Sequence, residues 1–166
     1  RSCACLRGRR VLQADERAYR AEVGSPRLHG QNGYTPSPGI VALFQPNEYY
    51  DSTDAYLDAI AEAMKTEYEG IVEAGFYLQI DAPDLAMGRH IMYRDEPDEV
   101  FVERAAVHVD AINQALRDVP GDRVRVHLCW GNYEGPHHLD IDVDKIFDDV
   151  MRLKASALQF EAANPR

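Results

Sequence analysis

His127 and Cys129 stand one residue apart in residues 123–130, a segment in which apolar and polar residues alternate. Such alternation predicts a β-strand whose successive side chains point to opposite faces, so the two residues share a face. Their separation along the strand is about 6–7 Å, which allows an imidazole and a thiolate to reach one ion. Because zinc prefers nitrogen and sulfur ligands in a tetrahedral arrangement, this pair is a candidate metal site.

Two acidic residues have a similar position on other segments. Asp81 ends the apolar segment 76–81, and Glu161 lies within residues 157–162, with the apolar side chains of each segment on the opposite face. If these segments are parallel strands, their polar faces meet at the carboxyl ends, where the active sites of (β/α) barrels lie. Glu161 then supplies a third metal ligand, and a fourth position stays available for a substrate.

The same residues also allow simpler interpretations. A cysteine on a strand often serves only as a small buried apolar side chain, and Glu161 could pair with Arg125 instead of a metal. His137 and His138 follow the strand in a loop, which is either solvated or forms a rim of the active-site mouth. Trp130 could stack on a substrate ring, although packing in the core is the stronger expectation.

Strand and helix patterns alternate through most of the chain. We expect strands at residues 39–44, 76–81, 123–130 and 157–162, and amphipathic helices at residues 52–74, 97–119 and 142–154. Alternation at intervals of roughly 40 residues is typical of parallel strands with helical crossovers. A closed eight-stranded barrel takes about 250 residues. We therefore predict an α/β fold, a partial TIM (β/α)8 barrel of about four strand–helix units, with an open doubly wound sheet as the alternative.

The first part of the chain fits this pattern poorly. Residues 24–33 are rich in glycine and other turn-forming residues and contain little that could be buried. We divide the chain into an irregular N-terminal segment, residues 1–35, and a partial barrel domain, residues 36–166.

Composition limits the classes of partner. Hydrophobic residues make up 45% of the chain and the net charge is −10, so the chain is globular and unsuited to nucleic acids or anionic membranes. Cys3, Cys5 and Cys129 do not form a disulfide framework, which favours a reduced, cytoplasmic setting. Cys3 and Cys5 are a second, weaker metal pair. No segment approaches the roughly 20 apolar residues of a membrane span.

Four stretches of the sequence resemble the cobalamin-independent methionine synthases, specifically their catalytic barrel domain. They are Ser-Pro-Gly-Ile-Val-Ala-Leu-Phe at residues 37–44, Leu-Gln-Ile-Asp-Ala-Pro-Asp-Leu-Ala at 78–86, His-Leu-Cys-Trp-Gly-Asn-Tyr-Glu-Gly-Pro-His-His at 127–138 and Phe-Glu-Ala-Ala-Asn-Pro-Arg at 160–166. The resemblance covers residues 36–166, and it is the combination of motifs that makes it specific.

The resemblance implies a zinc-dependent S-methyltransferase of methionine biosynthesis, in which a zinc-bound thiolate attacks an alkyl donor. It implies that His127, Cys129 and Glu161 bind the zinc, together with a later cysteine beyond Arg166. Asp81 is expected to bind the amino group of homocysteine, and the methyl donor would be 5-methyltetrahydrofolate. The chain offers no residue that we assign as the catalytic acid, because the catalytic histidine of the family also lies beyond Arg166.

Two alternatives remain. The loop at residues 133–138 looks more like a branch that includes epoxyalkane:coenzyme M transferases, in which the thiol is coenzyme M and the electrophile an epoxide. The chain lacks the later cysteine ligand of the family, and it also lacks a match to the opening strands of the family barrel. Both features fit a fragment or an inactive truncated remnant. Because four strands cannot close an eight-stranded barrel, we expect this chain to be inactive by itself.

Overall fold

A four-stranded parallel sheet forms the centre of the protein. The computed structural model describes residues 32–132 and 136–160. The strands are β1 (Asn32–Pro36), β2 (Tyr77–Asp81), β3 (Val124–His127) and β4 (Ala157–Gln159). Each strand pairs in parallel with the next one along the chain, which gives the spatial order β1-β2-β3-β4. The predicted α/β class with parallel strands is therefore confirmed for the described residues.

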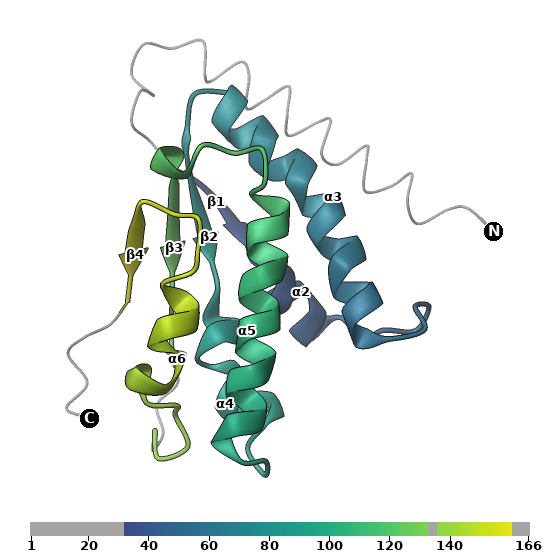
Figure 1. Ribbon diagram of the computed structural model, residues 1–166, viewed down its shortest axis with the longest axis vertical. Coiled ribbons are helices and arrows are strands. Elements are labelled where there is room, and N and C mark those ends of the chain that lie inside the picture. The colour runs from purple at the N-terminus through teal and green to yellow at the C-terminus, as the bar shows by residue number, and fades with distance from the viewer. Residues whose placement is uncertain (1–31, 133–135, 161–166) are drawn as a thin grey trace.

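The helices that connect the strands form one layer. They are α2 (Pro38–Phe44), α3 (Thr53–Glu73), α4 (Gly88–Met92), α5 (Asp98–Ala115) and α6 (Val143–Val150), with short 3-10 turns at Pro83–Leu85 and Gly121–Arg123. α3 packs against α5 and α5 against α6, and the three helices lie side by side on one side of the sheet (Figure 1). A doubly wound sheet reverses its strand order and carries helices on both faces, so this arrangement favours a segment of a barrel. Closure into a barrel stays a prediction.

The hydrophobic core lies between this helix layer and the sheet. The sheet contributes Leu78, Ile80, Val124 and Val126, and the helices contribute Leu57, Tyr68, Phe101 and Ile112 among others, all of them nearly inaccessible to solvent. The strand residues between the apolar ones point to the other face of the sheet, as strand geometry requires. The core thus fixes which side chains of each strand are left for chemistry.

The predicted strand at residues 39–44 is wrong, because this segment is the helix α2. Ser37 caps the helix: its Oγ accepts a hydrogen bond from the backbone N–H of Ile40 at 3.0 Å, and Pro38 follows at the first helical turn. The strand of this unit is β1, which lies earlier in a stretch predicted to be irregular. β1 also crosses the predicted domain division at residues 35 and 36, and that division stays a prediction.

The longer helices agree with the amphipathic pattern. α3 begins after Ser52, whose Oγ accepts from the N–H of Ala55 at 3.1 Å, and it is followed by Gly75 with φ of 94°. That left-handed conformation suits glycine, which is why the chain can turn sharply into β2. Within the described residues, no helix combines the length and the apolar character that a membrane span needs.

Candidate functional site

Asp81 and His127 meet at the carboxyl ends of two neighbouring strands. They are direct partners in the register of β2 and β3, and Nδ1 of His127 lies 2.6 Å from Oδ1 of Asp81. The side chain of Asp81 is 54% exposed and that of His127 is 25% exposed, so both can meet a ligand. With an ionised carboxylate, the imidazole donates its Nδ1–H to Asp81. The structure therefore brings together two of the four residues predicted from the sequence.

A second polar pair lies on the same face, one pleat below. Gln79 and Arg125 are also register partners, and Nη2 of Arg125 donates a hydrogen bond to Oε1 of Gln79. Gln79 is buried although it is polar, and the guanidinium of Arg125 provides its partner. The alternative pairing of Arg125 with Glu161 stays a prediction, because Glu161 lies outside the described residues.

Cys129 lies two residues beyond the end of β3. Its Sγ accepts a hydrogen bond from the backbone N–H of Gly131 at 3.1 Å, and its carbonyl oxygen accepts from the N–H of Met87 at 3.2 Å. Gly131 has φ of 93°, a conformation that glycine adopts without strain. N–H donors of this kind surround the sulfur ligands of metal sites and orient them. The turn at Gly131 thus holds Cys129 next to the end of the strand that carries His127.

The remaining predicted ligand, Glu161, lies outside the described residues, and so do Cys3 and Cys5. Gln159, two residues before Glu161, is the register partner of His127, so β4 runs beside the site. Within residues 32–132 and 136–160, no three His, Cys, Asp or Glu side chains gather as a metal site would require. The three-ligand prediction, which includes Glu161, stays a prediction.

Sequence reasoning missed two residues at the same end of the sheet. His90, in α4, and Asp140, in the loop before α6, approach each other to 3.2 Å, and Asp140 also binds Nδ1 of His137 at 2.8 Å. The spacing of His137 and Asp140, three residues apart, is the only local signal in the sequence for this cluster.

His138 is exposed. Trp130 packs against the core, as expected, and donates its Nε1–H to the carbonyl of Ile141.

A buried network supports the ends of β1 and β2 from beneath. Asp84 accepts hydrogen bonds from the hydroxyl of Ser37 and, at 2.8 Å, from Nδ1 of His108, and all three residues are buried. The backbone N–H of Ser37 also donates to the carbonyl oxygen of Asp81 at 2.8 Å. The network therefore ties α5 to the strand end that carries the Asp81 carboxylate.

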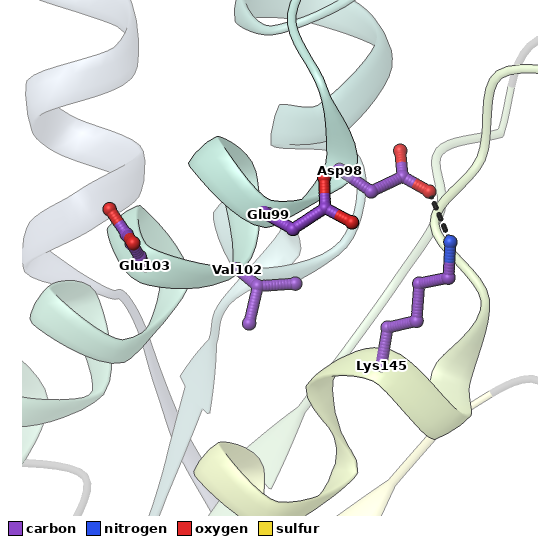
Figure 2. Close-up of a pocket in the computed structure, with 5 residues that line it drawn as sticks. All are labelled: Asp98, Glu99, Val102, Glu103 and Lys145. Carbon is purple, nitrogen blue, oxygen red and sulfur yellow. Dashed lines mark hydrogen bonds and ion pairs between the residues drawn. The ribbon is translucent and has the colours of Figure 1, made fainter.

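The outer helix layer carries a separate surface pocket of about 360 Å³. Its lining residues, drawn in Figure 2, are Asp98, Glu99, Val102, Glu103 and Lys145. Nζ of Lys145 lies 2.5 Å from Asp98, so part of the negative charge is neutralised locally. The pocket contains none of the residues at the strand ends, and it lies between two helices, α5 and α6.

Comparison with curated proteins finds similarity to methionine synthases. The chain is 30% identical to the methionine synthase of Saccharolobus solfataricus over 112 residues, which are 66% of this chain and 30% of that protein. The methionine synthase of Sulfurisphaera tokodaii is 28% identical over 125 residues, which are 75% of this chain and 32% of that protein. No protein-family model and no solved structure matches. The chain thus spans about a third of the length of these relatives, and the similarity supports a distant relationship to them.

Proposed function

We propose that this chain is part of a zinc-dependent thiol methyltransferase whose acceptor is homocysteine, built on a (β/α) barrel. The observation that supports it best is the Asp81–His127 pair at the carboxyl ends of β2 and β3, with Cys129 two residues further along. The distant relationship to methionine synthases independently favours the same activity. The proposed metal ligands are His127, Cys129 and Glu161, as the sequence resemblance implies.

Two of the proposed ligands, His127 and Cys129, are described residues whose side chains suit zinc. A histidine that binds metal usually donates its other ring N–H to a carboxylate, which fixes the tautomer and the orientation of the ring. Asp81 holds Nδ1 of His127 in this way, so Nε2 is the nitrogen that would bind the metal. Cys129 would supply a sulfur ligand, and the N–H of Gly131 holds its Sγ near the same strand end. When bound, zinc would keep an incoming thiol in its thiolate form at neutral pH, where a free thiol with a pKa of about 8.5 is mostly protonated.

Asp81 also favours an amino-acid thiol over coenzyme M. Its Oδ1 is engaged by His127, but the side chain is 54% exposed and a carboxylate has a second oxygen that can accept hydrogen bonds. An ammonium group, as in homocysteine, would be attracted to this carboxylate, whereas the sulfonate of coenzyme M would be repelled. We therefore propose homocysteine as the thiol and 5-methyltetrahydrofolate as the donor, with epoxide opening as the alternative chemistry.

Cobalt substitution tests the metal site directly. Co²⁺ bound in place of zinc gives a sulfur-to-metal charge-transfer absorption in the near ultraviolet, so the spectrum reports a cysteine ligand without any need for turnover. We expect this band in the wild-type protein and in Cys3→Ser, and its loss in Cys129→Ser. Zinc content measured by atomic absorption should fall in the same variant. An unchanged cobalt spectrum in Cys129→Ser would exclude Cys129 as a ligand.

Thiol addition tests the substrate. We expect homocysteine to intensify the charge-transfer band of the cobalt protein by adding a second sulfur ligand, at lower concentration than 2-mercaptoethanesulfonate. Asp81→Ala should reduce or remove the preference for homocysteine, because the carboxylate that attracts the ammonium group is lost. Tighter binding of 2-mercaptoethanesulfonate by the wild type would instead favour the epoxide-opening chemistry.

A further inference from the structure

A carboxylate lies between two imidazoles at the carboxyl end of the sheet, outside the proposed ligand set. Nδ1 of His137 lies 2.8 Å from Oδ2 of Asp140, and Nδ1 of His90 lies 3.2 Å from the other oxygen, Oδ1. The Asp140 side chain is only 6% exposed and that of His90 is 13% exposed. In the described part of the chain, Asp140 forms no ion pair with a lysine or arginine. We call these three residues the His–Asp–His cluster.

Two contacts fix this cluster beside Cys129. On one side, the N–H of Met87 donates to the carbonyl of Cys129 at 3.2 Å, and Met87 precedes His90 by one helical turn. On the other side, Nε1 of Trp130 donates at 2.8 Å to the carbonyl of Ile141, the residue after Asp140. Ile141 is buried in the core, which fixes this loop in place. Both halves of the cluster are therefore attached to consecutive residues, 129 and 130.

The two histidines have different relations to the carboxylate. The contact from His137 meets the geometry of a hydrogen bond, so an Nδ1–H of His137 orients Asp140. The 3.2 Å approach of His90 Nδ1 to Oδ1 becomes an ion pair when Nδ1 carries a proton and the imidazole is charged. An imidazole, unlike the side chain of lysine or arginine, can therefore be present here in either a neutral or a charged form. Arg89, the neighbouring cation on α4, is directed to Asp98 at 2.7 Å and does not replace it.

We propose that the His–Asp–His cluster takes up a proton at Nδ1 of His90 when a thiol binds as its thiolate beside Cys129. This inference rests on the proposed thiol-binding function. Binding breaks the S–H bond and adds a negative charge to the site. Formation of the N–H bond on His90 supplies a compensating positive charge, which Asp140 stabilises. Because binding and protonation are coupled, each favours the other by the same free energy.

Calorimetry of thiol binding measures this coupling. Homocysteine is titrated into the zinc-loaded 166-residue protein at about pH 7 in buffers with different ionisation enthalpies, and the variation of heat with buffer gives the number of protons released. A thiol that is mostly protonated in solution should release about one proton on binding as a thiolate. We expect the wild type to release less than about half a proton, because the cluster retains the rest.

Variants show whether the His–Asp–His cluster, and not another part of the loop, takes up the proton. His90→Gln and Asp140→Asn should each raise the release to about one proton per thiol. His138→Gln replaces an exposed histidine of the same loop, and it should keep the wild-type count. Far-ultraviolet circular dichroism and zinc content establish that each variant is folded and loaded. Nitrogen-15 chemical shifts of the histidine rings in the wild type, recorded with and without homocysteine, should show protonation of His90, so the inference can be tested even without the variants.

The outcomes distinguish this inference from the proposed function. If homocysteine does not bind the zinc-loaded wild type, the proposed function fails and the inference fails with it. If homocysteine binds and the wild type, His90→Gln and Asp140→Asn release equal numbers of protons, the inference alone is overturned. An unchanged His90 ring spectrum on thiol binding would overturn it as well.

Discussion

Replacing Gly39 by alanine should disrupt the buried network beneath the site. An added Cβ at this position would lie 2.0 Å from Oδ2 of Asp84 and 2.4 Å from Nδ1 of His108. Both distances are far shorter than any van der Waals contact, and the two atoms are themselves joined by a hydrogen bond of 2.8 Å. The Asp84 side chain is fully buried, so it has no space into which it can move. Either the helix α2 or the Asp84–His108 hydrogen bond must give way.

The expected cost follows from these two effects. Forcing a methyl group into a packed interior costs about 1–3 kcal/mol, and losing a buried hydrogen bond to a charged group costs about 1.5–3 kcal/mol. We therefore expect Gly39→Ala to lower the free energy of unfolding by about 2.5–6 kcal/mol, a large share of the roughly 5–15 kcal/mol typical of a domain. Urea denaturation followed by circular dichroism at about pH 7 measures this change.

Gly70→Ala is the matched control. Gly70 lies in α3, and a Cβ added there would meet nothing within 4 Å. Alanine is favoured over glycine inside a helix by about 0.5–1 kcal/mol, so this variant should be slightly more stable than the wild type. If Gly39→Ala instead unfolds within about 1 kcal/mol of the wild type, the close packing of Gly39 against Asp84 and His108 is refuted.

Three further changes have definite expected outcomes. Burial raises the pKa of Tyr68 well above its ordinary value, so stability should fall by up to about 1.4 kcal/mol per unit as pH rises above about 10, and this loss should be smaller in Tyr68→Phe unfolding curves. Arg89→Met should cost about 2–4 kcal/mol in urea denaturation, because Arg89 is buried and Nε binds Asp98 at 2.7 Å. Asp81→Asn should weaken zinc binding about 10–100-fold in a chelator competition titration, since the carboxylate that orients His127 is lost; equal affinities would contradict this role.

The helices could be predicted from the sequence because periodicity and capping agreed. The apolar spacing predicted a helix at residues 52–74, and the structure has α3 there, with Ser52 as the kind of residue that caps a helix start. The prediction of a strand at residues 39–44 was wrong because a short apolar run fits a strand and a buried helix equally well. The Ser37-Pro38 signal, typical of a helix start, would have decided for a helix. β1 was missed because three of its five residues, Asn32, Gly33 and Pro36, are poor strand formers, and the strand is held by pairing with β2.

The candidate site was only partly visible in the sequence for a related reason. Alternation along one strand predicts which side chains share a face, and so Asp81 and His127 could be expected on the same side of the sheet. No such rule connects His90 with Asp140, which lie on a short helix and on a loop fifty residues later. Their approach depends on where the connections after β2 and β3 pack, and that is decided by tertiary contacts of Met87 and Trp130.

The register of the sheet is what makes a site from these separate residues. Asp81 pairs with His127, and His127 in turn pairs with Gln159, so one row of side chains crosses three strands at the same level. A slip of one residue between β2 and β3 would turn the carboxylate or the imidazole toward the helix layer, and would bring Leu78 or Val126 to the polar face. Those apolar residues are fully buried. Exposing them by such a slip would cost about 1.5–3 kcal/mol of folding free energy for each residue. The hydrophobic core therefore enforces the contact between Asp81 and His127, and the polar site depends on the apolar face behind it.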